Sequence, residues 1–391
     1  MKKRTVIIGA AACAVALIVG GMWLFGGTSS KTISDAKFTA GGSFYSYTTP
    51  SAVVVMQGTR TVASVPERLT GYQFQATRWT LDGRYVVFLT IYAIGKPLLD
   101  QTLVSIDTES GAVARLPCPD CTTIVGDGGD EVLAYQADYQ QIWSVTLRSG
   151  KPSQETRIAI PKAVSDDHFI IGAKGQAVLA ITNVAQSAAT SNSESFYLVT
   201  AHGAVRELAA AGSESEVAPI AATGHSAIGD ATIAMGDSVH GGACQRAGFI
   251  HMLDPTNGVE TQVELVDAYP PNYEPGRNGG LEIHDLWWDD KGYLYATVES
   301  WICNGGDRKI TTPSSLWRFD GKHWTKTDAG PLAMVRTLAG GGRLVLSQHA
   351  DFTTYNEPIG GPLYLEQGSL SRTNVATNAL YISTPDQASI P

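Results

Sequence analysis

Hydrophobic and polar residues alternate over short stretches of this chain, and helical periodicity is almost absent. Most of these stretches follow a tight turn that contains glycine. Runs of about four to eight alternating or apolar residues bounded by such turns are typical of β-strands. The pattern therefore predicts an all-β chain, and clear strands are "RYVVFLT" (84–90), "QAVLAIT" (176–182), "GYLYATV" (292–298) and "GRLVLSQ" (342–348).

The glycine turns recur along the chain. One series falls at positions 83, 128, 174, 229, 291 and 341, so successive turns lie 45 to 62 residues apart. A second series, which includes Ser149-Gly150 and Asn257-Gly258, joins two further strands in each unit. Four strands in about 40 to 60 residues make one blade of a β-propeller. A lone four-stranded sheet exposes two apolar faces, whereas a radial arrangement of sheets buries both.

The two ends of the chain supply one further blade. Six complete units lie between about residues 76 and 377. Three N-terminal strands within 43–65 and a lone C-terminal strand within 379–385 would combine, with the C-terminal strand innermost. The predicted fold is thus a seven-bladed β-propeller whose ring closes without a covalent bond. Trp287 and Trp288 are adjacent in one strand, so we expect them to point to opposite faces and pack between blades.

The chain begins with a basic flank and an apolar run. Lysine and arginine at positions 2–4 precede Val6–Phe25, which carries no charge and is long enough to span a membrane as a helix. The basic flank is expected to stay in the cytoplasm. We therefore predict a transmembrane signal anchor over 1–27, a polar linker over 28–37 and the propeller over 38–391. A signal peptide that is cleaved to give a secreted protein is the alternative.

Composition limits which kinds of partner the predicted propeller can bind. Charged residues are only 17% of the chain, and glycines number 41, which suits a turn-rich exported domain. The net charge is −9, and no basic cluster follows Arg4, so a nucleic-acid surface is excluded. The expected location is the plasma membrane, single-pass, with the N-terminus cytoplasmic and the propeller extracytoplasmic. The expected partners are a protein or a cell-envelope polymer, and the membrane itself through the N-terminal helix.

Three stretches resemble a known superfamily. "WTLDGRYVVFLT", "WWDDKGYLYA" and "FIHMLDPTNGVETQ" are similar to the turn motifs of the broad TolB-like and WD40-like propellers found outside the bacterial membrane. Leu81 stands where the Pro-Asp-Gly motif has proline, and the Trp-Asp dipeptide of WD40 repeats is missing. The resemblance implies a fold, and folds of this kind host many functions.

One face of the predicted propeller carries long loops. Loops between the second and third strands of each blade share a face with the links between blades, and both are long here. Aromatic and arginine side chains on such loops favour recognition, although they could also pin the loops to the body. The long segments are 91–101, 183–195, 237–246, 267–280, 301–315 and 349–361; the predicted binding residues on this face are Tyr269, Tyr273, Arg277, Trp301, Arg308 and Tyr355.

Four cysteines fall on this same face. Cys244 and Cys303 lie in equivalent loops of adjacent blades, and an exported protein favours a disulfide between them. Cys118 and Cys121 flank a tight turn, so a local disulfide is expected there. A redox Cys-x-x-Cys site would need a thioredoxin-like unit, which is missing. A zinc site made by all four cysteines is the remaining alternative.

Three histidines are candidate ligands for a metal. His168, His225 and His284 are predicted near the starts of innermost strands, so they could converge at the mouth of the channel and hold a divalent metal, with His349 or Gln348 nearby. The alternative, by resemblance to WD40-type repeats, is that each histidine hydrogen-bonds its own inter-blade link. No other cofactor is predicted.

Two functions follow from these features. The sequence favours a binding protein that recognises a protein or envelope polymer through the long-loop face. The alternative is a metal-assisted hydrolase or lyase that acts on a saccharide or peptide at the channel mouth, since a related propeller architecture is known among metal-assisted polysaccharide lyases. No nucleophile elbow, phosphate-binding glycine loop or metalloprotease motif is present in the sequence.

Overall fold

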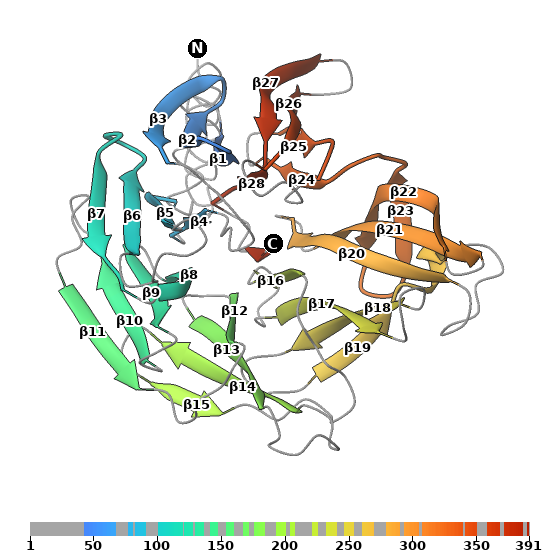
Figure 1. Ribbon diagram of the computed structural model, residues 1–391, viewed down its shortest axis with the longest axis horizontal. Coiled ribbons are helices and arrows are strands. Elements are labelled where there is room, and N and C mark those ends of the chain that lie inside the picture. The colour runs from blue at the N-terminus through green and yellow to red at the C-terminus, as the bar shows by residue number, and fades with distance from the viewer. Residues whose placement is uncertain are drawn as a thin grey trace, which may run out of the picture.

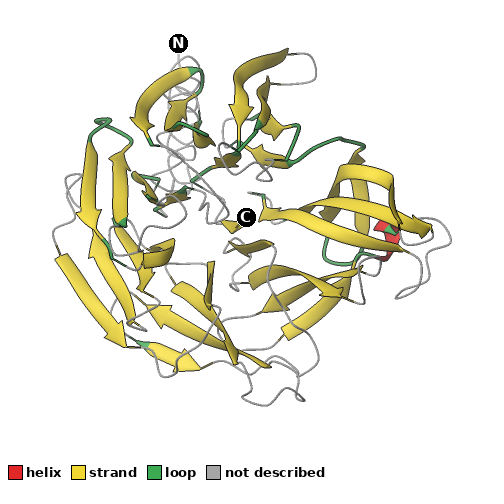
Figure 2. Cartoon of the chain, in the orientation of Figure 1, coloured by secondary structure: helices red, strands yellow, loops and turns green. Residues whose placement is uncertain are grey.

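The computed structural model is built from β-sheets set around a common centre (Figure 1). It describes residues 43–67, 77–80, 83–90, 101–119, 121–127, 130–136, 141–147, 154–159, 167–171, 176–183, 193–200, 204–207, 221–225, 232–240, 246–253, 260–269, 279–289, 293–304, 307–338, 341–349, 358–367, 371–385 and 389–390. In these ranges the chain forms strands and a single 3₁₀ turn, η3 (Val266–Ala268), which Figure 2 shows as the red segment. The predicted N-terminal helix lies outside these ranges, and no helix within them is long and apolar enough to cross a membrane.

Five sheets have four strands each, and four of them follow the chain as antiparallel meanders. Their strands are β4 (Arg78–Trp79), β5 (Tyr85–Leu89), β6 (Thr102–Asp107) and β7 (Val113–Pro117); β8 (Cys121–Asp127), β9 (Glu131–Gln136), β10 (Gln141–Thr146) and β11 (Gln154–Ala159); β12 (Asp167–Ile171), β13 (Gln176–Asn183), β14 (Ser193–Thr200) and β15 (Val205–Glu207); β24 (Met334–Thr337), β25 (Arg343–Leu346), β26 (Gly361–Gln367) and β27 (Ser371–Ala379).

Two meanders join into one nine-stranded sheet. A single parallel bridge, between Arg246 and Gly280, connects them. The last described strand of the chain, β29, pairs with the free edge of β16. The strands of this sheet are β16 (Ala221–His225), β17 (Thr232–His240), β18 (Arg246–Leu253), β19 (Glu260–Glu264), β20 (Gly279–Trp288), β21 (Leu294–Asn304), β22 (Asp307–Phe319), β23 (Trp324–Asp328) and β29 (Ser389–Ile390).

A sheet made from both ends of the chain closes the ring. β28 (Tyr381–Ser383) pairs antiparallel with β1 (Phe44–Thr49), which is followed by β2 (Ala52–Gln57) and β3 (Arg60–Pro66). Buried side-chain oxygens of Ser46, Thr77 and Ser383 lie 2.6–2.7 Å from one another, and Trp79 Nε1 donates to Ser383 Oγ at 3.0 Å. This network joins β28, β1 and the start of β4, so three segments distant in sequence meet at the closure.

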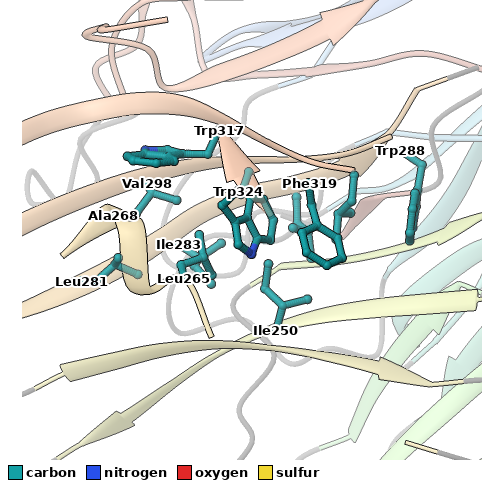
Figure 3. Close-up of a cluster of buried hydrophobic side chains, with 13 residues drawn as sticks. Ile250, Leu265, Ala268, Leu281, Ile283, Trp288, Val298, Trp317, Phe319 and Trp324 are labelled. Carbon is teal, nitrogen blue, oxygen red and sulfur yellow. The ribbon is translucent and has the colours of Figure 1, made fainter. Parts of the chain in front are cut away.

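The hydrophobic core lies between the sheets. In Figure 3 a cluster that includes Leu281, Trp288 and Trp324 fills the space between β18–β19 and the blade β20–β23. Trp287, the neighbour of Trp288, packs instead with Val335 and Val345 of the next blade. The two tryptophans therefore leave opposite faces of β20. Both faces of this sheet are buried, which is the packing that a radial arrangement requires.

Four glycines of the predicted turns lie in the described ranges, and all four have positive φ: Gly83, Gly111, Gly321 and Gly341. Gly83 has φ +66°, a conformation that side chains other than glycine rarely adopt, and its N–H donates to the carbonyl of Thr80 at 2.8 Å. This turn leads into β5, a strand in which all five residues are buried.

Two segments that the sequence predicts as loops are strand at the residues that the structure describes. The range 301–315 continues β21 as far as Asn304 and resumes with β22 at Asp307, and 237–246 likewise extends β17 and begins β18. Their glycine and polar residues predicted loops, but these residues pair with neighbouring strands and are therefore part of the sheet. Gly279 lies so close to the carbonyl of Trp301 that a Cβ there would clash, so this glycine allows the extended β20–β21 pairing.

Candidate functional site

Charged and phenolic side chains from four innermost strands gather around the centre of the ring. We call this set the central polar track, and it consists of Arg78 on β4, Asp285 on β20, Arg336 on β24 and Tyr381 on β28. Each strand is the inner edge of its meander or, for β28, of the closing sheet. Innermost strands surround the central channel of a propeller.

Asp285 and Arg336 form a fully buried ion pair. Both side chains have 0% exposure. Arg336 Nη2 donates to Asp285 Oδ1 at 2.9 Å, and Nη1 donates to Oδ2 and to the carbonyl of Val335. The guanidinium also lies 5.2 Å from the centre of the Trp287 ring. The pair is bidentate, so both oxygens of Asp285 accept hydrogen bonds from Arg336.

Arg78 is a second buried cation near this pair. It is 6% exposed, and its Nη1 donates to the carbonyl of Thr77 at the long distance of 3.5 Å. Its Nε has no partner among the described residues. Burial lowers the pKa of Arg78 to about 10, the positive charge of Arg336 lowers it further, and Tyr381 opposes the shift. The guanidinium nevertheless remains charged at neutral pH.

Tyr381 supplies a neutral hydroxyl to the same region. Burial raises its pKa to about 12, while the charge of Arg78 acts in the opposite direction. The phenol therefore stays protonated at neutral pH and can donate a hydrogen bond. The central polar track then holds two guanidinium groups and one carboxylate, so its positive charge is only partly compensated.

A second group of polar side chains lies on the same blade as Asp285. Glu282, His284 and Glu299 bring one ligand atom each to within 4.8 Å of one another, and the ring of His349 lies 4.1 Å from that of His284, centre to centre. We call these four residues the carboxylate–histidine cluster. Carboxylate oxygens and imidazole nitrogens are ligands for divalent metals such as zinc, manganese or iron.

Irregular pairing in the sheet positions this cluster. Ile283 pairs with Val298 and Asp285 with Thr297, so His284 is the extra residue of a bulge in β20. Glu299 is likewise skipped in the pairing of β21 with β22. Bulges redirect side chains and are frequent beside functional sites. Glu282 and Glu299 lie directly opposite each other across the strands, and like charges so placed destabilise a sheet.

His349 approaches the cluster from the next blade, in the segment that follows β25. It keeps an exposed edge, but its ring packs against His284. The loss of solvent lowers the pKa of His349, and the charges of Asp285 and Glu282 oppose this shift. The imidazole is therefore mainly neutral at pH 7, which is the form that binds metals.

The three predicted histidines do not occupy equivalent positions. His168 is the second residue of β12, as its sequence position suggested, but His225 is the last residue of β16 and His284 lies in the middle of β20. The prediction that all three stand near strand starts was wrong for His225 and His284. The convergence of all three histidines at the channel mouth stays a prediction. His284 instead clusters with two carboxylates.

The predicted binding residues have different surroundings. Trp301 is fully buried, and the Tyr269 hydroxyl donates to Glu264 at 3.0 Å, so both support the local fold. Arg308 lies on β22 near the end of the β21–β22 hairpin, opposite Cys303. Tyr273, Arg277 and Tyr355 lie outside the described residues.

Disulfides involve at least three cysteines. Cys118 and Cys121 form a buried disulfide with Cα atoms 5.6 Å apart, where β7 leads into β8. Cys303 on β21 is also disulfide-bonded, to a cysteine outside the described residues. Cys244, which lies outside these ranges, remains its predicted partner. The bridge of Arg246 to Gly280, which itself pairs with Trp301, brings this part of β18 toward Cys303.

The central polar track was missed at the sequence level. Its members are separated by up to 303 positions, and no local motif contains them. A usable signal was present in "TRWT" and "MVRT", where an arginine stands among residues expected to be buried in a short inner strand. An arginine at such a position is rarely fully buried unless it is paired or binds a ligand.

Comparison with known proteins supports the architecture. No protein family and no curated protein matches the chain. The β-propeller domain of the Trilobed protease from Pyrococcus furiosus is similar at 11% identity over 84% of this chain and 90% of that one, with a TM-score of 0.50. The fold is a β-propeller. Puromycin hydrolase is similar at 13% identity over 77% of this chain but only 46% of that chain, with a TM-score of 0.52. At these identities the likeness shows the fold alone, and it does not assign the chain to the TolB-like or WD40-like group.

Proposed function

We propose that this protein is a seven-bladed propeller anchored outside the plasma membrane by one N-terminal helix, and that it recognises a protein or an envelope polymer. The count of seven follows if the nine-stranded sheet is divided at its single parallel bridge. The basic flank and apolar run at residues 2–25 support the anchor and its orientation.

The β21–β22 hairpin carries this proposal. β22 pairs with β21 from Asp307 to Phe319, but β23 covers β22 only from Leu316 onward. Between Asp307 and Thr312, no described strand pairs with the outer edge of β22. An open strand edge can accept an extended segment of a partner by β-augmentation. The disulfide at Cys303 would hold this element in place.

The end of the hairpin carries one net positive charge, because Asp307 is followed by Arg308 and Lys309. Arg308 and the exposed Lys309 are adjacent on β22, while the chain as a whole has a charge of −9. A local positive site on an acidic protein favours an acidic partner and excludes most others. Acidic envelope polymers and acidic protein segments both meet this requirement.

Charge reversal at the hairpin is expected to remove binding. We expect the double variant Arg308→Glu, Lys309→Glu of the full chain to lose at least about tenfold in affinity, because two favourable charges become repulsive. The measurement is co-sedimentation with purified peptidoglycan sacculi, together with photo-crosslinking from position 311 in producing cells.

The control reverses two exposed lysines on the same blade, Lys322→Glu and Lys326→Glu. It changes the net charge equally and leaves the hairpin intact, so binding should persist. Equal loss in both variants would mean that overall charge, and not the hairpin, governs association. Absence of both sedimentation and crosslinks with the unaltered chain would refute the proposed recognition role.

A metal-assisted hydrolase or lyase is the second candidate. The carboxylate–histidine cluster favours it, because Glu282, His284 and Glu299 are close enough to share one ion and His349 lies beside them. A bound divalent cation would relieve the repulsion between the two opposed carboxylates and could polarise a carbonyl or activate water.

Metal content tests this candidate. We expect the purified full chain to carry about one equivalent of a divalent transition metal, and Glu282→Gln or His284→Ala to lose it. Removal of the metal should lower Tm in the unaltered chain only. Glu131→Gln, on the distant strand β9, is the control and should keep its metal. A metal-free protein whose Tm does not respond to zinc or manganese would exclude this function.

A further inference from the structure

Arg78 presents a charge that the described residues do not neutralise. A guanidinium has five N–H donors, and among the described residues the one acceptor that lies within hydrogen-bond distance of it is the carbonyl of Thr77, at 3.5 Å. Both carboxylate oxygens of Asp285 already accept from Arg336. Removing a cation from water without a partner is costly, so buried arginines are normally paired.

The position of Arg78 makes a purely structural role difficult to explain. Its neighbours Thr77 and Trp79 point to the closing sheet, where they bond to Ser383. Side chains alternate along a strand, so Arg78 leaves the other face of β4. There the charge of Arg336 repels it and Tyr381 is its favourable neighbour. Among the described residues, the side chains whose charge or hydroxyl acts on Arg78 are a second cation and a phenol, and no carboxylate is among them.

We propose that Arg78, with Arg336 and Tyr381 beside it, is a binding site for the carboxylate group of a ligand that enters the centre of the propeller. A planar guanidinium matches a carboxylate with two parallel hydrogen bonds, and Nε together with one terminal nitrogen forms such a fork. The site lies apart from the β21–β22 hairpin, so this proposal goes beyond the recognition function and does not depend on it.

The ligand class follows from the charges. With the Asp285–Arg336 pair neutral overall, the site carries about one net positive charge and suits a monoanion. A uronic acid and an acidic amino acid both present such a carboxylate. A phosphate dianion would leave one charge uncompensated in a buried place, so the site should prefer carboxylates.

The experiment measures Tm and calorimetric binding of the full chain in detergent. The probes are glucuronate, N-acetylglutamate, inorganic phosphate and neutral glucose. We expect a carboxylate to raise Tm by about 3 °C or more at a hundredfold excess over Kd, and glucose to have no effect. A larger rise in Tm with glucuronate would identify a saccharide as the source of the carboxylate. A larger rise with N-acetylglutamate would identify a peptide. Stabilisation by phosphate alone, or by none of the anions, would overturn the proposal.

Variants at Arg78 separate binding from structure. Arg78→Met keeps the length of the side chain and removes its charge, so this variant should bind the carboxylate at least about tenfold more weakly. Without ligand, it should unfold at the same Tm as the unaltered chain or at a higher one. Arg78→Lys keeps the charge without the fork and should also bind more weakly. Arg115→Met removes an exposed arginine paired with Glu67 and should bind normally. An Arg78→Met protein that is destabilised, fails to fold or still binds would assign Arg78 a structural role and contradict the proposal.

Discussion

A chain that ends at Leu380 is expected to lose the cooperative unfolding of the propeller. This truncation removes β28, and with it Ile382, which is 2% exposed, and the Ser383 hydroxyl that bonds Ser46, Thr77 and Trp79. Loss of a buried isoleucine side chain alone costs about 2–5 kcal/mol. Each polar group left without a partner adds about 1–3 kcal/mol. These losses approach the whole stability of a typical domain, about 5–15 kcal/mol.

The measurement is calorimetric unfolding, with a matched truncation as the control. A chain that ends at Pro385 keeps β28 and removes β29, so it should retain a single cooperative transition. The variant Ser383→Ala should fall between the two, with a loss of about 1–3 kcal/mol, because it leaves the Trp79 N–H unpaired. If the chain that ends at Leu380 unfolds like the full chain, β28 does not close the ring.

Replacing Asp285 by alanine is expected to destabilise the protein by about 3–5 kcal/mol. The substitution leaves the fully buried Arg336 without its counter-charge, and an uncompensated buried cation carries this cost. The double variant Asp285→Leu, Arg336→Met removes both charges and fills similar volume, so its stability should lie within about 2 kcal/mol of the unaltered chain.

Chemical denaturation of Asp285→Ala and of the double variant measures the two changes in stability. The exposed pair Arg115–Glu67 serves as the control, because solvent-exposed ion pairs contribute about 0–1 kcal/mol. A loss for Asp285→Ala as small as for Glu67→Ala would show that Asp285 and Arg336 are not buried together as the structure places them.

The architecture was accessible from the sequence because it rests on local signals. Glycine turns such as the one at Gly83 fix where strands begin, and period-two alternation fixes which residues face the neighbouring sheet. The placement of Trp287 and Trp288 on opposite faces follows from alternation alone, and the two side chains pack in separate clusters. The C-terminal strand has no neighbouring strand in the sequence to pair with. Its position beside the three N-terminal strands could therefore also be predicted.

Tertiary pairing accounts for what the sequence did not reveal. The stretch "WICNGGDRKITTPSS" has the composition of a loop, yet its two halves pair as a hairpin around residues 304–307. Trp301 therefore lies in the sheet and is buried, although its polar neighbours suggested a surface. The bulge at His284 adds one residue to β20 and changes which side chains His284 faces. A periodic pattern of apolar residues does not predict such an insertion.

The central polar track was inaccessible for a related reason. Arg78, Asp285 and Arg336 each stand on a different inner strand, and only ring closure brings them together. The sequence directed attention to histidines, because imidazoles at similar positions suggested convergence. Strand register places His225 at the end of β16, whereas Arg78 lies near enough to Arg336 to be affected by its charge.

The most direct test of the account is a crystal structure of the full chain soaked with glucuronate. We expect a carboxylate within hydrogen-bond distance of the Arg78 guanidinium, at the centre of a ring in which β28 pairs with β1. An Arg78 side chain neutralised by a carboxylate of the chain itself, with glucuronate bound elsewhere or not at all, would contradict it.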